Sequence, residues 1–104
     1  MANGVIIPSD DSVSWIEINA NLKYKVVNGI VFVWIKSQSD TSVNIGSIPA
    51  AFRPKDADCF FALLADTYIS PLRYWNVQVY RTGEVYTIGN TGYGLMTTIC
   101  YPLN

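Results

Sequence analysis

The dipeptide Asn28-Gly29 constrains the fold of this chain more than any other feature. It interrupts an apolar run over residues 22–36, and Asn-Gly is the pair that best accepts the two positive φ angles of a type I′ hairpin turn. A two-residue turn also sets the register, so Val27 is expected opposite Ile30 and the pairing continues outward to the ends of the run. The sequence therefore predicts an antiparallel hairpin with a defined set of cross-strand pairs.

The two faces of this hairpin differ in character. One face is apolar and is expected to belong to the core: Leu22, Tyr24, Val26, Val31, Val33 and Ile35. The other face mixes lysines with large apolar side chains: Lys23, Lys25, Val27, Ile30, Phe32 and Trp34. Two explanations are open for the mixed face. The lysine stems can lie over the aromatic rings with a small cation–π contribution, or a second sheet or a neighbouring subunit can pack there.

A second hairpin is predicted over residues 74–88, around Arg81-Thr82-Gly83. Threonine is β-branched and resists positive φ, so a three-residue loop with Gly83 in the left-handed region is favoured over a two-residue turn. One face then carries Trp75, Val77, Val79, Val85 and Thr87. The other face is rich in tyrosine and carries Tyr74, Asn76, Gln78, Tyr80, Glu84, Tyr86 and Ile88.

Further strands are expected at residues 13–18, 59–65 and 95–101, with others possible at 41–48 and, as a short edge strand, at 5–7. The run at 59–65 is apolar on both faces and is expected to be central in its sheet. Two prolines make residues 48–55 an extended corner. Together these elements predict a single all-β domain over residues 1–104, an antiparallel β-sandwich or small barrel, jelly-roll-like, of seven to eight strands.

Composition excludes several classes of function. The chain has no histidine and a net charge of −1, which removes the usual catalytic triads and histidine-bearing zinc sites and disfavours nucleic acid and anionic membranes as partners. The acidic pairs Asp10-Asp11 and Asp56-Ala57-Asp58 lack a ligand-rich loop for calcium. No catalytic residue, metal ligand or cofactor is therefore predicted. The N-terminal residues do not form a signal peptide, and no apolar run approaches the roughly 20 residues of a membrane span.

Charged residues make up only 14% of the chain, whereas about 25% is usual for a soluble domain. A homo-oligomer that buries additional surface is a direct explanation of this shortage. The two cysteines, Cys59 and Cys100, could form one disulfide or remain as two buried thiols. Buried thiols are favoured, because each cysteine lies in an apolar run and cysteine often behaves as a small apolar residue.

Three segments occur in an order that resembles a known family. They are Asn28-Gly29-Ile30-Val31, Ile48-Pro49-Ala50-Ala51-Phe52-Arg53-Pro54 and Thr82-Gly83-Glu84-Val85. The set is similar to the C-terminal head or tip domains of tail fibres and receptor-binding proteins of tailed bacteriophages, and the likeness spans roughly residues 15–88. That family often carries Leu-Pro-Ala-Gly-aromatic-Arg-Pro between two strands and a later Gly-x-Val hairpin turn. Here Ala51 stands where glycine is usual, and Ile48 replaces leucine.

The resemblance implies a homotrimeric β-domain at the tail tip or baseplate of a virion, attached to the rest of the tail fibre and made in the host cytoplasm. Such a domain adsorbs to a host cell-surface saccharide without catalysing a reaction, and Arg53 would cap carbonyl groups or pair with an acid near a subunit boundary. Two alternatives are a passive trimerising cap of the fibre tip and a stand-alone carbohydrate-binding β-sandwich.

A saccharide site needs an aromatic plate for the sugar ring and planar polar groups for its hydroxyls. The segment that best combines them supplies the predicted ligand-binding residues Asp66, Tyr68, Arg73, Tyr74, Trp75 and Asn76, together with Tyr93 from a glycine-rich loop. Trp75 falls on the valine face of its strand, so core packing competes with ligand contact for this residue. A structural role similarly competes with ligand contact for Tyr93.

Overall fold

A computed structural model describes residues 13–37, 42–66, 73–89 and 95–103. Within these ranges the chain forms eight β-strands and one 3₁₀ turn, the turn lying at Ala50–Phe52. The strands are β1 (Ile16–Asn19), β2 (Leu22–Val27), β3 (Ile30–Ser37), β4 (Val43–Ser47), β5 (Cys59–Asp66), β6 (Arg73–Val79), β7 (Glu84–Gly89) and β8 (Leu95–Pro102). The predicted all-β class is confirmed, and the expected short strand at residues 5–7 lies outside the described residues.

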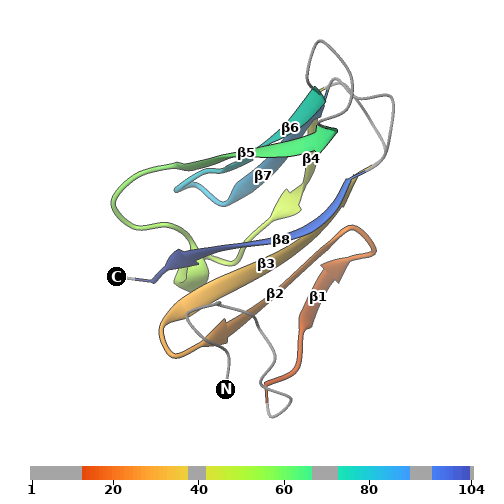
Figure 1. Ribbon diagram of the computed structural model, residues 1–104. Helices are drawn as coiled ribbons and strands as arrows, with labels where there is room; N and C mark the ends of the chain where they lie inside the picture. Colours follow the sequence, from red (N-terminus) through yellow and green to blue (C-terminus); the bar gives the residue numbers. More distant parts are fainter. Residues whose placement is uncertain (1–12, 38–41, 67–72, 90–94, 104) are drawn as a thin grey trace, which may run out of the picture.

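The strands form two four-stranded antiparallel sheets that face each other (Figure 1). Sheet A has the order β1-β2-β3-β8, and sheet B has the order β4-β7-β6-β5. Sheet B is a Greek key, because β5, β6 and β7 follow one another and β4 returns beside β7. The jelly-roll-like arrangement is not confirmed, since sheet A is a β1-β2-β3 meander extended by β8.

The first hairpin has the predicted turn and the predicted register. Asn28 and Gly29 have φ angles of 53° and 75°, and β2 pairs with β3 from Val27 opposite Ile30 through to Leu22 opposite Ile35. Its apolar face lies between the sheets, where Leu22, Val31, Val33 and Ile35 are fully buried, Tyr24 is 5% exposed and Val26 is partly buried.

The second hairpin also matches its prediction. The Tyr80 N–H donates to the Glu84 carbonyl at 3.0 Å and the Gly83 N–H donates to the Tyr80 carbonyl at 2.8 Å, so residues 81–83 form a three-residue loop. Gly83 has a φ angle of 103°, in the range that favours glycine. The predicted apolar face is in the core, with Trp75, Val77, Val79, Val85 and Thr87 each at most 1% exposed.

A polar contact joins the two sheets across this core. The Thr87 hydroxyl on β7 donates to the Ser37 hydroxyl on β3 at 2.8 Å, and both side chains are buried. A buried hydroxyl without a partner would cost stability, so this pair favours one alignment of the sheets. The Tyr101 hydroxyl on β8 donates to the carbonyl of Phe52, in the 3₁₀ turn that follows β4, at 2.6 Å.

The proline corner and the second hairpin form one structural unit. The Ile48 N–H donates to the Gly83 carbonyl at 2.9 Å, and the Arg53 Nε donates to the Ile48 carbonyl at 2.7 Å. The expectation that Arg53 caps a carbonyl group is therefore confirmed. Two of the three segments that carry the family resemblance are thus held together by backbone contacts.

The prediction that residues 59–65 form a central strand is wrong. β5 pairs with β6 and ends sheet B. Its inward residues Cys59 and Phe61 pack against the core, but Phe60 faces outward and is 62% exposed. The prediction rested on β5 having apolar residues on both of its faces, a pattern typical of a central strand. In the structure β5 is an edge strand, and its outward apolar side chains lie on the surface.

The mixed face of the first hairpin points away from sheet B, so neither sheet formed by the described residues packs on it. The contacts on this face agree with the explanation that lysine side chains lie over aromatic rings. The Lys23 Nζ lies 4.8 Å from the ring centroid of Trp34, and the Lys25 Nζ lies 5.0 Å from that of Trp15. Phe32 on this face is 4% exposed within the single chain.

The two sides of the sandwich have different kinds of edge strand. On one side lie β1 and β4, which contact each other, have four and five residues, and each carry a register shift in their pairing. On the other side lie β5 and β8, which have eight residues each; β5 also carries a register shift in its pairing with β6. Short edge strands resist pairing with another chain, whereas long ones invite it. The β5/β8 side is therefore the less protected one.

Replacing Gly83 by alanine is expected to lower the free energy of unfolding by about 2–4 kcal/mol. A methyl group there would adopt an unfavourable positive φ, lie 2.8 Å from the Ile48 carbonyl oxygen and collide with the Arg53 side chain. Gly29→Ala is the matched control, because Gly29 also has positive φ but nothing within 4 Å of the added group; its cost should be about 1–2 kcal/mol. Equal losses in urea denaturation would contradict the proposed packing at Gly83.

Candidate functional site

The predicted ligand-binding residues gather at the end of sheet B where β5 ends and β6 begins. Asp66 pairs with Arg73 and Leu64 pairs with Tyr74 in the β5–β6 register. The structure thus brings the backbones of Asp66, Arg73 and Tyr74 together. Tyr68 and Tyr93 lie outside the described residues, so their part in the patch stays a prediction.

Trp75 occupies the core position that its strand face indicated. It is 1% exposed, and a Cβ atom on Gly89, its cross-strand partner, would lie only 2.7 Å from its ring. Among the described residues, the buried Trp75 indole N–H has no hydrogen-bond partner. The ring is therefore enclosed by its own chain and is not an accessible plate for a sugar, which corrects its inclusion in the predicted site.

Asn76 lies on the outer face of sheet B, one outward position along β6 from Gln78, and Gln78 belongs to a row of side chains that sequence analysis did not select. Strand register places four neighbours across the sheet in the order Asn44, Tyr86, Gln78 and Phe60. Tyr86 is thereby flanked by two amide side chains. The alternation of tyrosines and amides along the second hairpin was the available signal for this surface. Phe60 was not predicted to be part of it, because β5 was expected to be a buried central strand.

Three aromatic rings on this face contact one another edge to face. The ring centroids of Phe60 and Tyr80 are 5.7 Å apart with planes at 72°, and those of Tyr80 and Tyr86 are 5.7 Å apart at 87°. Such T-shaped pairs are a favoured aromatic geometry. The Tyr80 hydroxyl also donates to Gln78 Oε1 at 2.8 Å. The cluster is thus held in place by packing and by a side-chain hydrogen bond.

This arrangement suits recognition of a neutral, hydroxylated ligand. A half-buried tyrosine ring offers an apolar face with a polar end, and amide side chains offer both donors and acceptors. On this face Asn76, Gln78, Tyr80 and Tyr86 are half-buried, while Phe60 and Asn44 are exposed. We name the outward residues Asn44, Asn76, Gln78, Tyr80 and Tyr86 the tyrosine–amide surface.

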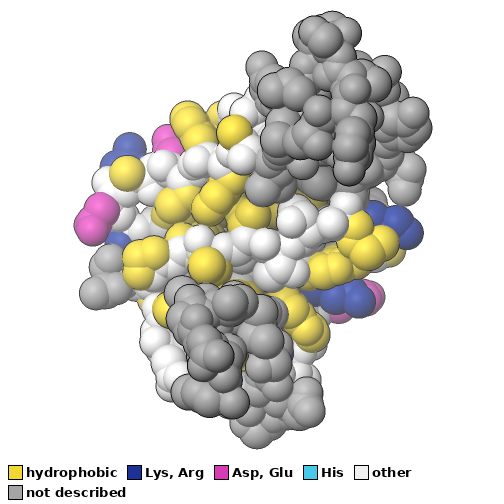
Figure 2. Space-filling view, viewed as in Figure 1, with side chains coloured by type: hydrophobic (Ala, Val, Ile, Leu, Met, Phe, Trp, Pro, Cys, Tyr) yellow, Lys and Arg dark blue, Asp and Glu magenta, His cyan; other side chains and the backbone are white. Residues whose placement is uncertain are grey.

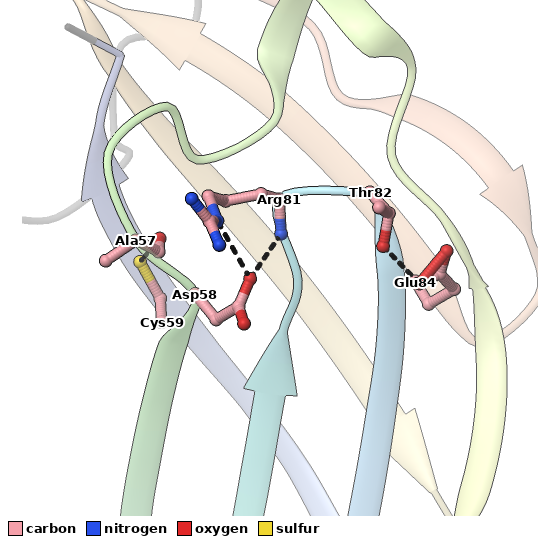
Figure 3. Close-up of polar contacts among 6 residues, drawn as sticks. All are labelled: Ala57, Asp58, Cys59, Arg81, Thr82 and Glu84. Carbon is pink, nitrogen blue, oxygen red and sulfur yellow. Dashed lines mark hydrogen bonds and ion pairs between the residues drawn. The ribbon is translucent and has the colours of Figure 1, made fainter.

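The carboxylates at the adjoining loop are engaged in shaping the chain (Figure 3). Asp58 Oδ1 accepts a hydrogen bond from the Arg81 N–H at 2.8 Å and lies 3.5 Å from the Arg81 Nε. The Thr82 hydroxyl donates to Glu84 at 2.5 Å. An ion pair this exposed contributes about 1 kcal/mol at most, so the contacts set the geometry of the loop more than they stabilise the fold.

No group of three or more Cys, Asp or Glu side chains in the described ranges is placed to hold a metal ion. The described residues likewise contain no helix long and apolar enough to cross a membrane.

Cys59 and Cys100 are free thiols, so the preference for unbridged cysteines is confirmed, but both are only partly buried. Burial, and secondly the adjacent Asp58 carboxylate, raise the pKa of the Cys59 thiol above its ordinary value. The thiolate is the reactive form of cysteine, so this environment suppresses nucleophilic chemistry at Cys59.

No protein-family model, curated protein or solved structure matches the chain.

The raised pKa of Cys59 predicts slow alkylation. In a Cys100→Ser variant, the pH midpoint of the reaction with iodoacetamide should lie above that of a free cysteine peptide, and Asp58→Asn should lower it. Because the folded state disfavours the thiolate, this group's contribution to stability is present below the unfolded-state pKa and is lost as the pH rises through the folded-state pKa. A midpoint at or below that of the free peptide would contradict the assigned environment.

Proposed function

We propose that this chain is a non-catalytic saccharide-binding domain of a bacteriophage tail fibre or receptor-binding protein. The observation that carries binding is the placement of Tyr86 between the amides of Asn44 and Gln78 on the outer face of sheet B. The assignment to a phage fibre is supported by the segments around Asn28-Gly29, Ile48–Pro54 and Gly83. Two of these segments are joined through Ile48 and Gly83.

A sugar would stack its C–H face on Tyr86 and direct its hydroxyls to the neighbouring amides. Sheet strands hold such side chains more firmly than loops do. The Tyr80–Gln78 hydrogen bond and the Tyr80–Tyr86 ring contact further limit motion of the surface. A site that is ordered before binding loses less entropy when the ligand arrives. This matters for a saccharide, because its individual contacts with a protein are weak.

The chain is proposed to act as a homotrimer, with the β5/β8 side at the subunit boundary. Support comes from the low charge content and from exposed apolar residues, Phe60 on β5 and Met96 on β8, which are 62% and 64% exposed. In the space-filling view, hydrophobic side chains gather across the middle of the visible face and charged ones lie toward its margins (Figure 2). Three linked sites would raise avidity for a repeating glycan by roughly 10² or more if all can engage together.

Tyr86→Ala is expected to reduce binding to purified host cell-wall or capsular polysaccharide at least tenfold, because it removes the stacking ring. Tyr86→Phe keeps the ring and should retain most of the binding. The assay is direct binding to the immobilised polysaccharide, with the melting temperature as a check on folding. Tyr93→Ala tests the loop patch predicted from the sequence: loss of binding in that variant, with Tyr86→Ala unaffected, would move the site to the loop.

Light scattering at micromolar concentration is expected to give a mass of three chains of 11.6 kDa each. Phe60→Lys should shift the mass toward one chain, because it places a charge at the proposed boundary. Ile16→Lys is the matched control: Ile16 is 51% exposed on the short strand β1, where no subunit contact is proposed. A trimer with no polysaccharide binding and no effect on phage adsorption would favour the passive cap, and a binding monomer would favour a stand-alone sugar-binding domain.

A further inference from the structure

A hollow lies on the outer face of sheet A, on the opposite side of the sandwich from the tyrosine–amide surface. Its volume is about 200 Å³, and its described lining consists of Trp15, Lys23 and Trp34. Trp15 precedes β1, while Lys23 on β2 and Trp34 on β3 are direct cross-strand partners. Pockets for drug-sized ligands measure roughly 300–1,000 Å³, so this hollow fits one small unit of a larger ligand.

The strands place four kinds of side-chain chemistry in one row through this hollow. The order across sheet A is Glu17, Lys23, Trp34 and Thr98. An ammonium group and a hydroxyl therefore flank the half-buried indole of Trp34. Glu17 and Thr98 are exposed at the two ends of the row. The row thus combines a stacking surface with polar groups on both sides.

A lysine ammonium lies over each of the two indole rings. The Lys23 Nζ lies 4.8 Å from the Trp34 ring centroid, and the Lys25 Nζ lies 5.0 Å from the Trp15 ring centroid. The Lys25 ammonium is 3.3 Å from the Val13 carbonyl oxygen, to which it donates, and the Lys25 side chain is 3% exposed. Lys25 is therefore committed to the protein interior, while the half-buried Lys23 lines the hollow itself.

A ligand suited to this hollow must be apolar on one face and negatively charged at one edge. The C–H face of a sugar ring can stack on Trp34, and a carboxylate or phosphate on that sugar can form a charge-assisted hydrogen bond with Lys23, stronger than a neutral one. A neutral sugar would not use the ammonium in this way, and a cationic ligand would be repelled by Lys23. The charge of the site thus selects among saccharides.

We propose that Trp15, Lys23 and Trp34 form a second binding site, selective for an anionic sugar unit. The saccharide class rests on the proposed function, whereas the selectivity for an anion rests on Lys23 and on its position beside the Trp34 ring. The two sites lie on opposite sheets, so each can be removed without altering the side chains of the other.

The test is titration of the full chain with galacturonic acid oligomers, with galactose oligomers of equal length as the neutral counterpart, followed by calorimetry and tryptophan fluorescence. Galacturonic acid oligomers are expected to bind at least tenfold more tightly than the neutral ones at low salt, and the difference should shrink at high salt. Lys23→Met should remove the preference, and Lys23→Arg should retain it. Lys36→Met is the matched control, because it removes the same charge from an outward position on β3, two residues from Trp34.

Equal binding of the charged and neutral oligomers, or equal loss in Lys23→Met and Lys36→Met, would overturn the proposal. Inorganic phosphate is the second probe. If phosphate saturates the site and galacturonic acid oligomers do not bind, the site binds anions without recognising a sugar, and the proposal is wrong. Trp34→Phe should weaken binding while the unfolding midpoint changes little.

Tyr86→Ala separates this site from the proposed function. Preference for the acidic oligomer should persist in that variant and be lost in Lys23→Met. If Tyr86→Ala abolishes the preference and Lys23→Met does not, the hollow is not the anionic site although saccharide binding stands. If only Lys23→Met affects binding of every saccharide, the tyrosine–amide surface is not the site proposed for the main function, and the hollow remains.

Discussion

Burial of one apolar face of each sheet against the other is the interaction on which the remaining structure depends. Neither sheet can hide this face alone, and the core draws on both sheets, with residues such as Val31, Val33, Val77 and Val85 fully buried. Each such side chain contributes about 1.5–3 kcal/mol relative to exposure. The Thr87–Ser37 hydrogen bond, which joins β7 of sheet B to β3 of sheet A, then favours one alignment among those that burial would permit. The core therefore provides the energy, and a polar contact provides the registration between the sheets.

The alternation of side chains along a strand has a direct consequence for the outer faces. Once the inward positions are assigned to the core, every second residue is directed away from it. On sheet B this produces the tyrosine–amide surface, which has aromatic rings and amides but few charges. On sheet A it produces paired lysines and tryptophans. The same two-layer fold thus presents two chemically different faces, one neutral and one cationic.

Edge strands impose a further constraint on what this domain can do. The β1/β4 side has edge strands of four and five residues, while the β5/β8 side has edge strands of eight residues each. This asymmetry supports assembly in one direction only. The trimer remains a proposal, and its support at this side is that the two longer edge strands lie together.

The sequence alone determined the features that depend on near neighbours in the chain. Asn28-Gly29 and Gly83 specified two hairpins, their registers and their inward faces, because the φ angles of a short turn and the two-residue period of a strand are local properties. The tertiary structure decided that β5 is an edge strand of its sheet. It also decided that the Trp75 ring packs against the backbone of Gly89, and that Trp15 lies beside the Lys23–Trp34 pair. These outcomes depend on which distant segments pair and which faces remain uncovered. An apolar run such as residues 59–65 has the same pattern at a sheet centre and at an edge, so only the assembled fold distinguishes the two.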